Sequence, residues 1–390
     1  MRILYVDWNM YGKQDIIDGF SALGHEVICT DIPLVYEGDR EKLEKQLDTC
    51  VKDLGADIAF TSNYYPVVSN ICEKYKIKYI SWVYDNPLIS LYDKSIVNSC
   101  NYVFMFDSAE CKRLQNMGIC TVFYMPLAVN PKRLDKIEIT KEDKRLFSSD
   151  VSIVASLYNE KHNLYDRMAP KLSKYTRGYL EGLMDVQKSL FGGFILEEPL
   201  YKTEIISDMY KALPYQIPNE SFASQQYVYA NYFLARKTAY MQRTEYISEL
   251  SKCFDMKVYS GGDLSSIPLA KHMGTVDYMT DMNKVFRLSK INLNITLPSI
   301  QSGIPLRAMD IMGNGGFLLT NYQKDMFDFF EPEVDFVYYT SLDEAKELIS
   351  YYLEHEDERK CIAANAKEKM TKYHSFEDRI KDTLYIVENA

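Results

Sequence analysis

Short apolar runs alternate with amphipathic segments along most of this sequence, and this alternation constrains the fold more than any other feature. In the first 130 residues, runs rich in Val, Ile, Phe and Tyr fall at 2–7, 25–32, 56–62, 78–84, 102–107 and 121–126. Segments with helical spacing, such as 12–24 and 41–55, lie between them. Apolar runs without polar alternation indicate strands buried on both faces, as in a parallel sheet covered by helices. The first part of the chain is therefore predicted to be a Rossmann-like, doubly wound domain.

After a charged link at 130–150, the alternation of apolar runs and amphipathic segments returns. Further apolar runs fall at 151–158, 255–261, 291–296, 315–321 and 336–340, whereas about 160–250 and 343–389 have a helical pattern. A chain of 390 residues is long enough for two domains. We predict an α/β fold of two Rossmann-like domains, each with a doubly wound parallel sheet, that face each other across a cleft. The expected boundaries are 1–148 for the N-terminal domain, 149–372 for the second domain with a helical insertion at about 160–250, and 373–390 for a C-terminal helix that packs back on the first domain.

Composition excludes several classes of function. The formal net charge of −10 argues against binding to nucleic acid or to an anionic membrane, since both depend on clustered Lys and Arg. No run approaches the roughly 18 apolar residues of a membrane span, and the N-terminal MRILYVDW has no secretory signal. A soluble, cytoplasmic protein is expected. Because the eight cysteines and five histidines show no metal-ligand spacing, no metal site is expected.

The segment SGIPLRAMDIMGNGGFLLTN, at 302–321, carries the strongest motif. It contains a Pro-x-Arg step ending at Arg307, an acid at Asp310, and a glycine turn at Gly315 and Gly316 that leads into a buried strand. In doubly wound sheets, phosphate-bearing ligands bind at the carboxyl ends of the strands, where loops and helix N-termini present N–H groups. This segment is therefore the first candidate for a ligand site.

This segment is similar to the donor-binding region of the spore-maturation CgeB-like glycosyltransferases, relatives of the large retaining family marked by Glu-x7-Glu and a Gly-rich turn. Residues 351–380 resemble the C-terminal end of the same family. Residues 78–92 and 122–131 resemble the N-terminal domain of unknown function that often accompanies it. The resemblance implies a bacterial protein with the GT-B fold. It also implies sugar transfer from a UDP-sugar or another nucleoside diphosphate sugar to a hydroxyl of a protein or glycan, with no metal and no resident cofactor.

The resemblance assigns roles around the 302–321 segment. Asp310 stands at the second Glu of the pattern and is expected to contact the donor, whereas Ser302, followed by Gly303, stands at the first. Because this departure removes one carboxylate, the choice between a retaining and an inverting reaction stays open.

The relatives neutralise the donor diphosphate with an Arg at the end of the second domain's first strand and a Lys five residues later. Ser156 occupies the Arg position, and Lys161 keeps the second. A leaving nucleoside diphosphate gains negative charge that preorganised cations must meet. Arg307 is expected to supply the charge that Ser156 lacks.

Four further residues are expected at the donor. Asp277 and Tyr278 fall in a loop before a helix, where the equivalent loop of two-lobed glycosyltransferases holds the base. Tyr259 would contact the donor through its backbone. Asn294 lies on a strand and is expected to orient the loop that follows.

Asp85 ends the fourth strand and is the candidate general base or positioning group at the acceptor hydroxyl, in preference to Asp7. Each candidate also has a structural interpretation. Arg307 would form an ordinary ion pair, Asp310 would interact with a helix dipole, and Asp85 would cap its loop.

Two other functions remain open. A nucleotide-sugar-modifying enzyme such as an epimerase fits the same two halves. A noncatalytic, nucleotide-binding GT-B homologue is the second alternative, and Ser302 at an expected Glu favours it.

Overall fold

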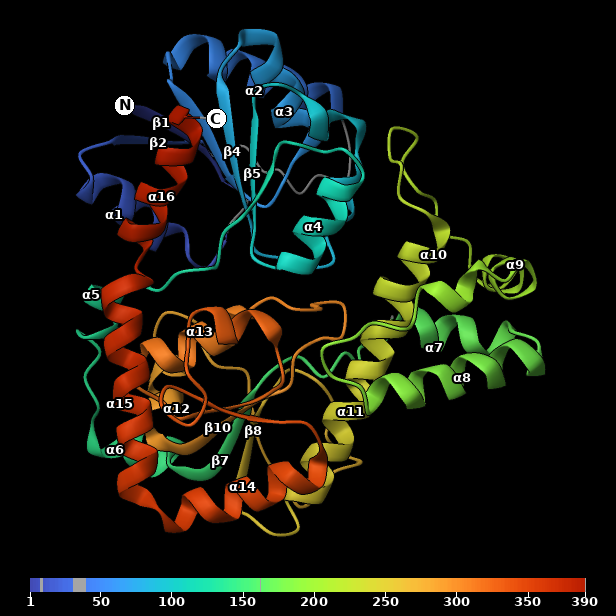
Figure 1. Cartoon of the computed structure of the whole chain (residues 1–390), viewed down its shortest axis with the longest axis vertical. Helices are drawn as coiled ribbons and strands as arrows, with labels where there is room; N and C mark the ends of the chain where they lie inside the picture. Colours follow the sequence, from blue (N-terminus) through green and yellow to red (C-terminus); the bar gives the residue numbers. More distant parts are fainter. Residues whose placement is uncertain (8–9, 31–39, 162, 390) are drawn as a thin grey trace. The chain divides into compact units, whose positions relative to one another are not determined.

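The computed structural model describes residues 1–7, 10–30, 40–161 and 163–389, and these residues form two compact units. Unit 1 comprises Met1–Asn130, Pro218–Ala223 and Tyr373–Ala390, and unit 2 comprises Pro131–Ile217 and Ser224–Lys372. Figure 1 shows the path of the chain through both units. Each unit is built on its own parallel sheet.

The sheet of unit 1 has six strands within the described residues, in the order β2-β1-β3-β4-β5-β6. The strands are β1 (Arg2–Val6), β2 (Glu26–Thr30), β3 (Ile58–Ser62), β4 (Lys78–Val83), β5 (Asn101–Met105) and β6 (Val122–Tyr124). The chain first moves outward from β1 to β2 and then returns to build the other side from β3. The strand order therefore reverses between β1 and β3, where doubly wound sheets bind ligands.

Helices cover the strands of unit 1. They are α1 (Lys13–Ala22), α2 (Arg40–Leu54), α3 (Pro66–Tyr75), the 3-10 turns η1 (Ile89–Tyr92) and η2 (Lys94–Val97), α4 (Ser108–Asn116) and α16 (Phe376–Asn389). The C-terminal helix α16 packs on α1 at Gly19, where an added Cβ would lie 2.7 Å from Ile380. Lys78 also donates to the carbonyl of Val387 at 2.6 Å. The last residues of the chain thus complete the N-terminal unit.

The sheet of unit 2 has the order β12-β11-β10-β7-β8-β9 within the described residues. Its strands are β7 (Ser149–Val154), β8 (Met256–Tyr259), β9 (Lys271–Gly274), β10 (Ser289–Asn294), β11 (Leu318–Asn321) and β12 (Val337–Tyr339). Read from β9, this is the order 3-2-1-4-5-6 of a Rossmann sheet. The reversal falls between β7 and β10, which pair through Val151 and Ile291 at the centre of the core.

The remaining helices belong to unit 2. They are α5 (Pro131–Leu134), α6 (Lys141–Phe147), α7 (Leu164–Met168), η3 (Ala169–Lys171), α8 (Lys174–Lys188), η4 (Glu198–Tyr201), α9 (Thr203–Ala212), α10 (Gln225–Val228), the π-helical η5 (Tyr229–Leu234), α11 (Ala235–Leu250), α12 (Asp281–Leu288), α13 (Leu306–Gly313), η6 (Lys324–Asp328), α14 (Leu342–Glu354) and α15 (Glu356–Tyr373). In Figure 1, α7 to α10 lie to one side of the sheet that contains β7, β8 and β10. The second half of α11 instead joins the core through Tyr246, Ile247 and Leu250. None of the helices in the described ranges combines the length and the apolar composition of a membrane crossing.

The predicted α/β architecture is confirmed, and each predicted strand is present within a few residues of its expected bounds. Residues 31 and 32, at the end of the second predicted strand, lie outside the described residues. The strand β9 was not predicted. It is short, lies at the sheet edge, and exposes Lys271 and His272, so it has no buried apolar run.

Residues 131–147 pack in unit 2, so the compact units divide at Asn130 and Pro131. Arg287 of α12 donates to the carbonyls of Leu134 and Ile137. Lys284 of α12 pairs with Asp143 at 3.0 Å. These contacts tie the charged link to unit 2, although its sequence resembles a linker between domains.

Asp143 should give the protein a defined acid sensitivity. Hydrogen bonds from the backbone and hydroxyl of Thr140, together with Lys284, lower the pKa of Asp143 from 3.8 to about 2. A depressed pKa in the folded state stabilises the protein above the unfolded value, and this contribution is lost as the pH falls from about 4 to about 2. We expect Asp143→Asn to be less stable than wild type at pH 7 and to approach it at pH 2, as measured by urea melts across this range.

The control is Glu142→Gln, which removes an exposed carboxylate of the same helix. It should keep the wild-type pH dependence. Equal destabilisation by Asp143→Asn at pH 2 and pH 7 would contradict the role of the ionised carboxylate.

Candidate functional site

The loop that follows β10 is fixed by amide and hydroxyl side chains. Asn294 is buried and donates to Thr296 Oγ1 at 3.1 Å and to Thr320 Oγ1 at 2.9 Å. The backbone N–H of Thr296 donates to Asn321 Oδ1 at 2.8 Å. The contacts of Asn294 are those expected of a residue that orients this loop.

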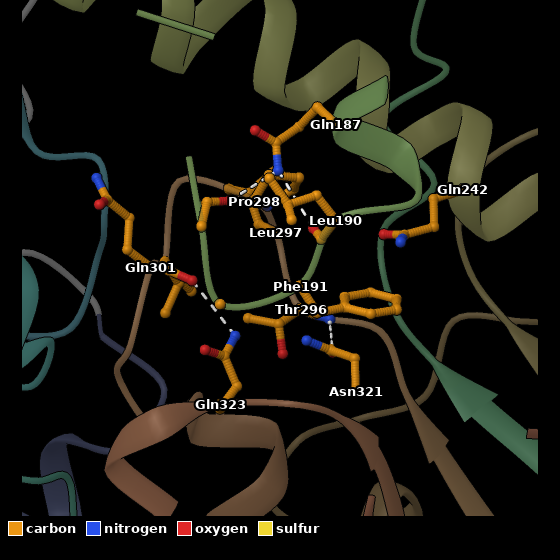
Figure 2. A pocket seen from close by; sticks show the side chains of 13 residues that line it. Gln187, Leu190, Phe191, Gln242, Thr296, Leu297, Pro298, Gln301, Asn321 and Gln323 are labelled. Carbon is orange, nitrogen blue, oxygen red and sulfur yellow. Dashed lines mark hydrogen bonds between the residues drawn. The ribbon is translucent and has the colours of Figure 1, made fainter. Parts of the chain in front are cut away.

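A small cavity lies under the same loop. Figure 2 shows carboxamide side chains from α8, α11 and the end of β11 around it. Gln187 donates to the carbonyls of Leu190 and Gly193, and Gln323 donates to that of Ile300. The cavity measures about 20 Å³, room for about one water molecule. Gln323 therefore holds the loop, Gln187 holds the neighbouring segment 190–195, and the cavity has no space for a sugar ring.

The loop leads into α13, whose first two turns carry the predicted residues Arg307 and Asp310. The N-cap residue Pro305 provides no side-chain hydrogen bond to the first amide groups of the helix. Arg307 Nη1 lies 3.5 Å from Asp310 Oδ2, and the hydroxyl of Tyr278 donates to Asp310 Oδ1 at 3.1 Å. The structure thus brings together three of the predicted donor residues, Arg307, Asp310 and Tyr278.

Asp310 and Arg307 differ in exposure. The Asp310 side chain is 8% exposed, whereas that of Arg307 is 30% exposed and lies over the ring of Phe286. Asp310 accepts hydrogen bonds from both neighbours, so it holds Arg307 and Tyr278 in place. The predicted direct role of Asp310 in the reaction stays a prediction.

Ser302 and Gly303 immediately precede the start of α13. The hydroxyl of Ser302 donates to Asp325 Oδ2 at 3.3 Å, and the N–H of Asp325 donates back to the Ser302 carbonyl at 2.9 Å. Asp325 is fully buried. A carboxylate therefore lies beside the position where the resembling family has its first Glu, but a different segment provides it.

The two glycines after α13 serve the packing of the helix end. Gly315 has a φ of 73°, in the left-handed region that favours glycine. A Cβ on Gly316 would lie 2.6 Å from the carbonyl oxygen of Phe286 and 2.7 Å from Asn292 Nδ2. The contacts of both residues are with protein groups, and their predicted role at the donor stays a prediction.

The remaining predicted residues of unit 2 lie in three places. Ser156, at the carboxyl end of β7, is exposed and donates to Glu160 at 3.3 Å, and Lys161 is exposed nearby. Asp277 accepts from the N–H groups of residues 279 and 280 at the start of α12, which is a structural capping contact. The side chain of Tyr259 is buried against Phe147. No contact tests their predicted roles at the donor.

Sequence reasoning missed Arg243, which lies at the reversal of strand order in unit 2. It is 7% exposed, and it donates to the carbonyl of Ser156 after β7 and to that of Ile295 after β10, at 2.6 Å for Nη2. Burial lowers the pKa of its guanidinium, and the charge of Arg307 adds to this effect. The helical spacing of Arg243 with the apolar residues Tyr246, Ile247 and Leu250 could have indicated that it lies on the buried face of α11.

The carboxyl edge of the unit 1 sheet holds the predicted acceptor-side residue. Asp85 is exposed, and its Oδ2 accepts from Asn63 Nδ2 at 2.7 Å. Asn63 also accepts from the N–H groups of Tyr84 and Asp85, at 2.8 and 3.1 Å, and has a φ of 69°. Asp7, the less favoured candidate, pairs with Lys13 at 2.7 Å. Asn63 is a second residue that the sequence did not single out, and it fixes the direction of the Asp85 carboxylate.

A family model matches the later part of the chain. Residues 243–385 match the model of a family described as Glycosyl transferase-like. The match begins at Arg243 and includes α12, α13 and the strands β10 to β12. The sequence matches none of the curated proteins with which it was compared. Over residues 243–385, a little more than a third of the chain, the sequence is therefore similar to glycosyltransferases.

Solved structures identify the fold more closely. The chain is similar to sucrose-phosphate synthase from Thermosynechococcus elongatus, with 10% identity and a TM-score of 0.57 over 100% of this chain and 98% of that one. It is similar to HepE of Anabaena in complex with UDP-glucose, with 11% identity, a TM-score of 0.53 and complete coverage of both chains. It is also similar to WaaG, a glycosyltransferase involved in lipopolysaccharide biosynthesis, with 9% identity, a TM-score of 0.53 and 99% coverage of both. The predicted GT-B fold is confirmed.

Proposed function

We propose that this chain transfers a sugar from a nucleoside diphosphate sugar to a hydroxyl group of a protein, polysaccharide or other glycan. The observation that carries the proposal is the start of α13, where an uncapped helix N-terminus and Arg307 lie at the carboxyl edge of the second Rossmann-like sheet. A helix N-terminus and a guanidinium together suit a diphosphate, which gains negative charge as it leaves. The family match over the same segment supports this role.

In this proposal, unit 2 binds the donor and unit 1 binds the acceptor. In unit 2, Arg307 would contact the diphosphate, with Asp310 and Tyr278 holding it in place. In unit 1, Asp85 would position the acceptor hydroxyl and accept its proton, with Asn63 directing the carboxylate. Transfer would require no metal and no resident cofactor, with the nucleotide sugar as co-substrate. A UDP-sugar is the first donor to test, since UDP-glucose is bound in the similar HepE structure.

We also infer the CgeB-like subgroup, with the N-terminal domain that accompanies it. The support is the 302–321 segment, which keeps an acid at Asp310 and the glycine turn but has Ser302 at the first Glu. Beside Ser302, the buried carboxylate of Asp325 accepts a hydrogen bond from the Ser302 hydroxyl.

The experiment is a binding and turnover screen of the full chain. Thermal shift and calorimetry would be run with UDP, GDP, ADP, CDP and dTDP, followed by nucleotide release from the matching sugar donors over a panel of acceptors. No response to any nucleoside diphosphate would contradict the proposal. Isomerisation of the donor sugar without nucleotide release would identify an epimerase, and binding without turnover would indicate a noncatalytic homologue.

Arg307→Ala should weaken binding of the nucleoside diphosphate about 10-fold, because one charge-assisted contact at a partly exposed position is lost. Calorimetric titration with the nucleotide identified in the screen measures the change. The control is Arg177→Ala on α8, which removes an exposed arginine paired with Glu181 and should leave the affinity unchanged. If Arg307→Ala and wild type bound the nucleotide with equal affinity, Arg307 would not be part of the donor site.

A further inference from the structure

Two arginines on α11 lie against the same aromatic ring. Arg236 and Arg243 are seven residues apart, so they project from the same side of the helix. Their guanidinium carbons lie 5.9 and 5.1 Å from the ring centroid of Tyr158. Tyr158 lies in the loop after β7, which ends at Val154, and has a φ of 55°. Helix α11 therefore places two positive charges near the carboxyl end of β7, the first strand of unit 2.

Neither charge is neutralised by a carboxylate in the described part of the chain. Arg243 donates to the carbonyls of Ser156 and Ile295, which are neutral dipoles. Arg236 Nε is buried and has no hydrogen-bond acceptor among the described residues. The neighbouring Lys237 differs, because it pairs with Asp166 at 2.7 Å.

Arg243 is buried, whereas Arg236 is half-buried. A positive charge that is withdrawn from water without a counter-charge is costly, and an anion that occupies the same place removes much of the cost. The carbonyls that hold Arg243 belong to the ends of β7 and β10, the two strands between which the order of the sheet reverses. Ligands of doubly wound sheets bind at this point. The position and the uncompensated charge therefore favour the same kind of ligand, an anion at the carboxyl edge.

We propose that Arg236 and Arg243, arranged around Tyr158, form an anion site that receives the diphosphate of the donor. The proposal rests on the proposed function and assigns the diphosphate to cations of α11 in addition to Arg307. Arg243 donates hydrogen bonds to the residues after both strands, and its positive charge attracts the anion. Arg236, the more exposed of the two, is the group that adjusts to the ligand.

The test compares Arg236→Met with Lys237→Met in the full chain. Each variant replaces one cation of α11 by a side chain of similar length, but only Lys237 has a carboxylate partner. Calorimetric titrations would use UDP, UMP and uridine, or the corresponding series for the base found in the screen. We expect Arg236→Met to weaken UDP binding about 5- to 10-fold, to leave uridine unchanged and to reduce the salt dependence of UDP binding, whereas Lys237→Met behaves as wild type.

The outcomes separate the two proposals. If wild type binds no nucleoside diphosphate, the proposed function fails. If wild type binds UDP and Arg236→Met binds it equally well, or loses UDP and uridine to the same extent, the anion site is overturned while the proposed function stands. Arg243→Lys serves as a second variant, with thermal melts to verify folding. Unchanged UDP affinity in both folded variants would also overturn the site.

Discussion

Asp85→Asn should lower kcat for sugar transfer by about 10²- to 10⁴-fold while nucleotide affinity stays at the wild-type value. Asp85 lies at the carboxyl edge of the unit 1 sheet, and the donor residues lie in unit 2. An asparagine has the same shape and still accepts a hydrogen bond from Asn63 Nδ2, so the loop should keep its structure. What is lost is the ability to accept a proton from the acceptor hydroxyl. Steady-state kinetics at saturating donor and acceptor measure the effect.

The matched control is Asp53→Asn, which changes an exposed carboxylate of α2 in the same unit. It should keep wild-type kcat. If Asp85→Asn retained full turnover, the base would have to be sought elsewhere. If Asp85→Asn lost nucleotide affinity as well, a structural role of Asp85 would replace the chemical one.

Gly316→Ala should lower the free energy of unfolding by about 2 to 3 kcal/mol. The added methyl group would lie 2.6 Å from the backbone oxygen of Phe286 and 2.7 Å from Asn292 Nδ2. Asn292 cannot easily move, because it is buried and donates to the carbonyls of Phe286 and Phe317. The turn after α13 would therefore have to shift. Thermal and urea melts measure the loss.

Gly182→Ala is the control for this substitution. Gly182 lies inside α8, and a Cβ there would meet no atom within 4 Å. Alanine has the higher helix propensity, so this variant should be more stable by about 0.5 to 1 kcal/mol. A Gly316→Ala protein as stable as wild type would show that the turn relaxes without cost.

The strands could be predicted because burial on both faces leaves continuous apolar runs such as 3–6 and 102–105. The edge strand β9 could not be predicted, because its side chains are partly or fully exposed and form no apolar run. The pairing of Arg307 with Asp310 follows from helical spacing once α13 is placed. Their contact with Tyr278 could not be predicted, because it joins segments far apart in sequence.

The roles of Arg243 and Asn63 could not be predicted from the sequence, for different physical reasons. Arg243 lies in a segment whose helical pattern suggested an insertion, and only the tertiary structure brings α11 to the ends of β7 and β10. Asn63 acts through a left-handed backbone and three hydrogen bonds to another loop. An Asn after a strand has many uses, so its type and position alone did not indicate this one.

The position of α16 has a consequence for biosynthesis. The ribosome completes the sheet strands of unit 1 by residue 124, yet the helix that covers α1 at Gly19 begins only at Phe376, about 250 residues later. During translation of the intervening residues, the apolar side of α1 that receives Ile380 has no cover. Such a surface is what chaperones bind on growing chains, so truncated products that lack α16 should be aggregation-prone even though every strand of unit 1 is present.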